Sequence, residues 1–161
     1  MTMPGAPYIY YGEEIGMLGL KPDENIREPF LWDMKEKDAG RTSWIEPKYT
    51  TDATVTPLEV QKNDAGSYFN HYKTLISLRN ANPALAIGTL ELPEIEYPKP
   101  IMAYARKSGD QELFVIHNLG TEEIMVDAPK GFDKKIFTLG KTAHAEGKVK
   151  LGKNASMVLG R

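Results

Sequence analysis

The pattern of apolar and polar positions divides the chain into three regions. Near its start, residues 7–11 form a short run of proline, tyrosine and isoleucine that ends at Gly12. A short, continuous apolar run bounded by proline and glycine is typical of a strand buried on both faces, as in a parallel sheet covered by helices. Such a strand needs a neighbour on each side. The neighbours either follow later in the chain or belong to a longer protein of which this chain is the tail.

The second region, residues 21–64, is polar and shows neither helical nor strand periodicity for long. It contains four prolines, and irregular stretches of this length in compact domains are usually functional or disordered. Both tryptophans of the chain, Trp32 and Trp44, lie in it. Because disordered segments contain few aromatic residues, we expect an ordered loop.

A helix is predicted over residues 65–80. Apolar and aromatic residues recur there at spacings of three and four, from Tyr68 to Ile76. Asp64 is a good N-cap for this helix. The sequence Asn82-Pro83 ends it, because proline cannot continue a helix and restricts the residue before it.

The third region begins at about residue 87, where short apolar runs alternate with turns rich in Gly, Asp and Pro. Strands at such spacing are typical of a small antiparallel sandwich. The expected strands are residues 101–106, 112–117, 123–126, 135–138, 148–151 and 156–159.

Composition narrows the range of partners. Hydrophobic residues make up 41% and charged residues 26% of the 161 residues, so a packed core is expected. The net charge is −2 and no basic stretch exceeds two residues, so neither nucleic acid nor an anionic membrane is an expected partner. The absence of cysteine excludes disulfides and thiolate metal sites.

Several blocks of this sequence resemble the α-amylase family (glycoside hydrolase family 13), and they follow one another in the order that the family has. The Arg-Glu-Pro-Phe sequence of the long loop is more similar to bacterial α-amylases than to oligo-1,6-glucosidases. The blocks are residues 4–17, which resemble the eighth strand of the family's barrel, 26–33 (the loop after it), 67–88 (the last barrel helix and its exit), and 102–106 and 113–118 (strands of the C-terminal domain).

The resemblance implies an α/β remnant followed by an all-β domain. Residues 1–86 would form the C-terminal portion of a TIM (β/α)8 barrel, with strand eight, a long loop and helix eight. Residues 87–161 would form an antiparallel β-sandwich. The family's catalytic Asp, Glu and Asp follow barrel strands four, five and seven, which would precede this segment. Retaining hydrolysis needs two carboxylates at one bond. We therefore expect no catalytic residue here, although the parent would hydrolyse α-1,4-glucans.

The same resemblance indicates Asp23 and Arg27 as substrate-binding residues, and Trp32 is added because an aromatic face fits the C–H face of a sugar and Trp32 lies near Arg27 in the sequence. In the family, an Asp and an Arg four residues apart in the loop after strand eight face the sugar, and Asp23 and Arg27 keep that spacing. A carboxylate accepts from vicinal hydroxyls and a guanidinium donates to them. The alternatives are a structural salt bridge for the charged pair and loop packing for Trp32 and Trp44.

No cofactor is expected in this chain, although the parent could bind calcium through oxygen ligands. The long loop is acidic, but its spacing is not that of an EF-hand and basic residues are interleaved, so a solvated loop is the stronger expectation. His71, His117 and His144 lie far apart and are given no metal role. The acidic residues in question are Asp23, Glu24, Glu28, Asp33, Glu36 and Asp38.

Two other functions stay open. A carbohydrate-binding module would need exposed aromatic residues on the sandwich, where Tyr97 and Tyr104 are the candidates, and a purely structural domain would need none. Phe114, Phe132 and Phe137 are expected in the core. The expected partners are an α-glucan oligosaccharide in the parent and a second copy of this chain, because the unpaired edges of a strand at 7–11 would recruit another chain. The alternatives for this strand are that it lies against the helix at 65–80 or frays.

Overall fold

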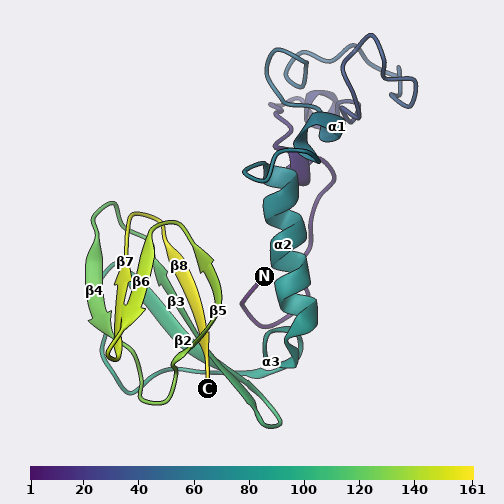
Figure 1. Cartoon of the computed structure of the whole chain (residues 1–161). Helices are drawn as coiled ribbons and strands as arrows, with labels where there is room; N and C mark the ends of the chain where they lie inside the picture. Colours follow the sequence, from purple (N-terminus) through teal and green to yellow (C-terminus); the bar gives the residue numbers. More distant parts are fainter. The chain divides into compact units, whose positions relative to one another are not determined.

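The computed structural model describes residues 1–161 and contains two compact units, each with its own core (Figure 1). One unit comprises residues 7–76, and the other comprises residues 1–6 together with 77–161. Helix α2 (Tyr68–Ala81) contributes residues to both. The two units are defined by how the residues pack together. They do not test the domain boundary expected between residues 86 and 87, which stays a prediction.

The second unit contains an antiparallel sandwich, as the sequence predicted. The order of strands is β1-β2-β3-β8-β5 in one sheet and β4-β7-β6 in the other, and every pairing is antiparallel. The strands are β1 (Thr89–Glu91), β2 (Ile101–Ser108), β3 (Gln111–Asn118), β4 (Ile124–Asp127), β5 (Lys134–Leu139), β6 (Thr142–Ala145), β7 (Lys148–Leu151) and β8 (Ser156–Gly160). The sequence missed β1 and β6, because a run of three or four residues carries too little alternation to be recognised.

Two clusters of apolar side chains bury the five-stranded sheet on both faces. Phe114 and Ile116 of β3 meet Val149 and Leu151 of β7 between the two sheets. On the other face of β3, Leu113 belongs to a second cluster with residues of the short helix α3 (Pro83–Ala86). Strand β3 is therefore buried on both sides along most of its length.

Arg79 of α2 binds the first residues of the chain through their main chain. It donates to the carbonyl oxygens of Met1 and Met3 at 2.6 and 2.9 Å, and it also donates to those of Gly5 and Ala86. The guanidinium has five donors in a fixed fork, which suits it to several carbonyls at once. Arg79 thus fixes the path of the first residues against the end of α2.

Arg106 of β2 also binds main-chain carbonyl oxygens, from a buried position in the sandwich unit. It is fully buried, at 0% exposure, and donates to the carbonyl oxygens of Gly88 at 2.8 Å and Thr89 at 3.1 Å, and to that of Thr2. Burial, reinforced by the charge of Arg79, lowers the pKa of Arg106. A buried guanidinium needs this many acceptors to offset the loss of water.

A neutral hydrogen-bonded chain lies beside these arginines. His117 of β3 pairs through Nδ1 with Ser156 Oγ at 2.8 Å and through Nε2 with Tyr104 Oη at 3.3 Å, and Tyr104 Oη lies 2.7 Å from Thr2 Oγ1. Burial, followed by the charge of the N-terminal ammonium group, lowers the pKa of His117. The uncharged imidazole is therefore the form that the fold favours.

The expected strand at residues 7–11 does not form in this structure. No residue of this segment belongs to either sheet, and Tyr8 is 94% exposed. A central strand is stabilised by ladder hydrogen bonds to neighbours, and this chain supplies no neighbour for it. The segment leads instead into the 3-10 helix η1 (Glu13–Ile15).

The rest of the first unit is irregular, as predicted for residues 21–64. Its other elements are the 3-10 helix η2 (Asp23–Ile26), the single helical turn α1 (Leu58–Gln61) and α2. A small core of Ile15, Leu31, Val55 and Leu58 holds them together. The long loop is therefore an ordered structure with its own buried centre.

Helix α2 begins later than the sequence predicted. Its first residue is Tyr68, and the Oγ of Ser67 accepts the amide of Asn70 at 3.2 Å, so Ser67 and not Asp64 caps the helix. Asp64 accepts from Gly66 at 2.8 Å in the preceding turn. The predicted end is confirmed, because α2 stops at Ala81 before the Asn-Pro pair. No helix of the chain is both long enough and apolar enough to cross a lipid bilayer.

Replacing Arg106 by lysine is expected to lower the free energy of unfolding by about 2 kcal/mol, because one ammonium cannot reach the three carbonyls that the guanidinium serves. Urea unfolding followed by circular dichroism measures this. Lys107→Met, an exposed change on the same strand, is expected to shift the free energy by less than about 0.5 kcal/mol. An unchanged midpoint for Arg106→Lys contradicts the assigned role.

His117 predicts a pH dependence of stability. Its pKa is lowered on folding, so its contribution is fully present above the ordinary histidine value of about 6.5 and is lost as the pH falls from there through the folded-state pKa. Thermal unfolding between neutral and mildly acidic pH measures the slope. His117→Gln should flatten it, whereas His71→Gln, which leaves the buried network intact, should retain it.

Candidate functional site

The long loop of the first unit is organised by one buried carboxylate. Glu28 is 1% exposed and accepts four hydrogen bonds from three consecutive main-chain amides. Its Oε1 accepts from Lys48 at 2.7 Å and Tyr49 at 3.1 Å, and its Oε2 accepts from Tyr49 at 3.1 Å and Thr50 at 2.7 Å. Successive amides that converge in this way form an anion-binding nest. Glu28 thus joins two parts of the loop that are about twenty residues apart.

Thr50 carries this connection further. Its Oγ1 donates to the carbonyl of Leu18 at 2.9 Å and accepts from the amide of the same residue at 3.1 Å. The guanidinium of Arg41 donates to the carbonyl of Thr50 at 3.0 Å. The segment at 48–50 is therefore tied to Leu18, which precedes η2, and to Glu28 and Arg41, which follow it.

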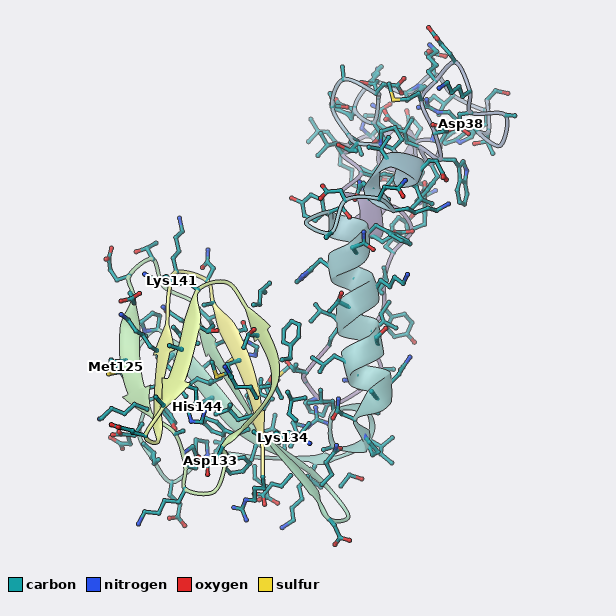
Figure 2. The ribbon with its side chains drawn as sticks, in the orientation of Figure 1. Asp38, Met125, Asp133, Lys134, Lys141 and His144 are labelled. Atoms are coloured by element: carbon teal, nitrogen blue, oxygen red, sulfur yellow. The ribbon has the colours of Figure 1, made fainter.

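Asp38, which Figure 2 labels, also fixes part of the loop through hydrogen bonds to main-chain amides. Its Oδ2 accepts from the amides of Trp32 at 3.0 Å and Asp33 at 3.2 Å. The ring of Trp32 also packs on that of Phe30, with centroids 4.4 Å apart and planes inclined by 48°. The position of the Trp32 ring is thus fixed by its own main chain and by an aromatic neighbour.

These contacts surround a cavity of about 290 Å³ in the first unit. One part of its lining comes from residues 27–32 and another from residues 40–44. Both tryptophans contribute, with Trp32 48% and Trp44 57% exposed. The side chains that matter chemically are Tyr11, Arg27, Phe30, Trp32, Thr42 and Trp44.

The structure brings two of the three predicted binding residues to this cavity. Arg27 and Trp32 line it, whereas Asp23 does not. Asp23 lies beside Arg27, with 3.6 Å between Asp23 Oδ2 and Arg27 Nη2, and it is also paired with Lys21. The side chains of Asp23 and Arg27 are 50% and 59% exposed, so both the salt bridge and free polar atoms are present. Exposed pairs of this kind add little stability.

Tyr11 is a cavity residue that the sequence did not indicate. Its hydroxyl donates to the carbonyl oxygen of Glu28 at 3.2 Å. Burial raises the pKa of Tyr11, with Tyr10 and Glu28 acting in the same direction and Arg27 in the opposite one. The phenol is therefore kept protonated and can donate a hydrogen bond at neutral pH.

Four of the acidic residues of the loop have partners within the loop. Glu28, Asp33 and Asp38 all accept main-chain amides, and Asp23 pairs with cations. The structure contains no group of three or more His, Cys, Asp or Glu residues placed to hold a metal ion. The oxygen atoms of these four residues organise the loop.

A larger cavity of about 460 Å³ lies at the start of α2, lined by residues such as Tyr68 and His71. Its most buried polar group is already paired, because Gln61 Nε2 donates to the carbonyls of Ile15 and Thr56 at 2.8 and 2.7 Å. It gathers none of the predicted binding residues.

The aromatic residues proposed for a binding face on the sandwich are not available there. Tyr104 is 2% exposed, inside the core beneath α3. Tyr97 packs partly buried against the other core, its hydroxyl donates to the carbonyl of Asp127 at 2.9 Å, and burial raises its pKa to about 12. Phe114 and Phe132 are buried as expected, and Phe137 packs partly buried against a core cluster. The candidates for a sugar-binding sandwich face were therefore wrong.

Two family models match successive parts of the chain, in the order that the fold shows. The model described as alpha amylase, catalytic domain, matches residues 1–88, which is more than half of the chain. The model described as alpha-amylase SusG C-terminal domain matches residues 101–158, the sandwich. The chain belongs to the α-amylase family.

Individual members of the family agree with this assignment. Alpha-amylase 3 of Dictyoglomus thermophilum is 42% identical over 123 residues, which cover 76% of this chain and 24% of that protein. Alpha-amylase SusG of Bacteroides thetaiotaomicron is 36% identical over 98% of this chain and 24% of its own length. The crystal structure of alpha-amylase from H. orenii has a TM-score of 0.84 and 32% identity, and covers 99% of this chain and 33% of that chain. This α-amylase-family chain thus spans about a quarter to a third of the length of these relatives.

The family assignment supports the predicted fold class: a portion of an α-amylase catalytic domain followed by an all-β C-terminal domain. Among the residues that line the cavity, the sequence did not indicate Tyr11 or the role of Glu28, and it favoured loop packing over sugar stacking for Trp44. Trp44 offered a signal, since an exposed ring in an ordered loop can serve a ligand. The hydrogen bonds of Glu28 could not be recognised in the sequence, because its partners are main-chain amides about twenty residues away and almost every residue has such an amide.

Proposed function

We propose that the cavity of the first unit binds an α-glucan oligosaccharide as part of the substrate cleft of an α-amylase-type glycoside hydrolase. The single observation that carries this is the convergence of Arg27, Trp32 and Trp44 on one cavity, in a chain of the α-amylase family. The parent would hydrolyse α-1,4 bonds with retention, and this chain would supply part of the cleft and a stabilising β-domain.

The chemistry of the lining fits a neutral sugar. An aromatic face packs against the C–H face of a glucose ring, and the two tryptophans present half-exposed rings. Arg27 can donate two parallel hydrogen bonds to neighbouring hydroxyls, while Asp23 beside it can accept from them. Asp23, Arg27 and Trp32 therefore remain the proposed substrate-binding residues, and Trp44 joins them.

The division of labour follows the sequence. Residues 1–86 are proposed as barrel-derived and residues 87–161 as the C-terminal domain; the end of α3 at Ala86 and the catalytic-domain match to residue 88 support this boundary. No pair of carboxylates in the candidate cavity is placed to act as nucleophile and acid. The chain alone is accordingly expected to release no reducing sugar from maltoheptaose above a protein-free control.

Binding can be followed without any label, because both tryptophans of the chain line the same cavity. Titration of the chain with maltoheptaose is expected to give a saturable change in tryptophan fluorescence, and the β-linked cellohexaose is expected to give none. Arg27→Ala and Trp32→Ala should each raise Kd about tenfold, the equivalent of roughly 1.4 kcal/mol. Lys62→Ala, an exposed change at the end of α1, is the matched control and should leave Kd unchanged. Absence of any saturable response in the unaltered chain contradicts the proposal.

We also propose that a second copy of this chain is a partner, bound through the segment that contains residues 8–11. Tyr8, Ile9, Tyr10 and Tyr11 are all exposed, with no strand beside them. Unpaired apolar segments of this kind recruit other chains. Sedimentation equilibrium is expected to show a concentration-dependent dimer that Tyr10→Lys weakens, whereas Tyr68→Lys, an exposed tyrosine on α2, leaves it intact. A monomer at every concentration overturns this part of the proposal.

A further inference from the structure

The candidate cavity depends on a carboxylate that does not offer its oxygens to it. Glu28 stands in the chain between Arg27 and Pro29, and all three residues border the cavity. Its carboxylate, however, is occupied by the amides of residues 48–50. Its four hydrogen bonds use the full accepting capacity of an ionised carboxylate.

Those amides belong to the segment that follows the second part of the lining. Thr42 and Trp44 are a few residues before Lys48, and Arg41 is bound to the carbonyl of Thr50 at 3.0 Å. The Glu28 nest therefore fastens the segment that contains Trp44 to the segment that contains Arg27. The small core of this unit contains no residue from 40–50, so polar contacts hold this part of the loop.

We propose that Glu28 is a positioning residue of the candidate glucan site: it fixes the distance between the Arg27–Trp32 side and the Trp44 side without touching the sugar. This inference rests on the proposed function of the cavity. The shape that binds the sugar exists only while the segment 48–50 is held. Loss of the nest lowers the fraction of molecules that are competent to bind, and the apparent Kd rises in inverse proportion to that fraction.

Glutamine is the informative replacement at this position. Its volume is nearly the same, but one of its two terminal atoms is an amide nitrogen that donates and cannot accept. It can keep two of the four bonds and would oppose an N–H to an N–H at the others. A buried donor left without an acceptor is destabilising, so the variant holds the segment 48–50 less firmly.

Glu28→Gln is expected to raise Kd for maltoheptaose about tenfold, measured by tryptophan fluorescence. The fluorescence change at saturation should equal that of the unaltered chain, because the sugar restores the competent shape. Amide hydrogen exchange at Lys48, Tyr49 and Thr50 should be faster in the free variant and return toward the original rate with sugar bound. Glu36→Gln removes the same charge from an exposed position of the same loop and should change neither quantity.

The outcomes separate the two proposals. If the unaltered chain does not bind maltoheptaose, the proposed function fails. If it binds and Glu28→Gln binds with the same Kd, the positioning role is wrong while the site stands. If the variant does not fold, the unaltered chain decides: amides 48–50, which make no contact with the cavity, must gain protection when maltoheptaose binds, and their unchanged exchange overturns the inference.

Discussion

Main-chain polar groups that lie outside a helix or sheet ladder need a partner when they are taken out of water, and in this chain buried charged side chains are that partner. Glu28 collects amides, whereas Arg79 and Arg106 collect carbonyls. In each case one side chain does what a neighbouring strand would do in a regular sheet. The irregular segments of this protein are ordered because of these three residues and the small apolar core beside the loop.

The same constraint explains why the site has its present form. An aromatic lining gives a sugar ring a surface to pack on, but a loop can hold its tryptophans apart only if its own backbone is fixed. Asp38 fixes the main chain at Trp32, and the Glu28 nest fixes the segment after Trp44. The parts of the site that face outward are thus positioned by charges that face inward.

The sandwich and the main helix could be predicted from sequence because their signals are local. Alternating runs between turns gave six of its eight strands, and the Asn-Pro pair gave the end of α2. The segment 7–11 carries the pattern of a buried strand, yet a pattern cannot show whether a partner strand is present to pair with it.

The candidate site was predictable only where residues act alone. Arg27 was indicated by family resemblance and Trp32 by its aromatic ring near Arg27, and both reach the cavity. Tyr104, a candidate for the exposed aromatic residues that a carbohydrate-binding module would need, lies in the core, where it packs in one cluster with residues of α3. In the sequence Glu28 cannot be told from the other acidic residues of a solvated loop. Only its hydrogen bonds to the amides of residues 48–50 distinguish it from them.

The two arginines also set how freely the start of the chain can vary. Arg79 and Arg106 bind the carbonyl oxygens of residues 1, 2, 3 and 5, and every amino acid carries the same carbonyl. Thr2, whose hydroxyl meets Tyr104, and Gly5, whose φ of 94° favours glycine, are exceptions; the other first residues are bound through their backbone and not through their side chains. The side chains of Met1 and Met3 therefore matter less to this contact than Arg79 and Arg106 do, so the sequence constraint lies about eighty to a hundred residues away from the segment whose path it fixes.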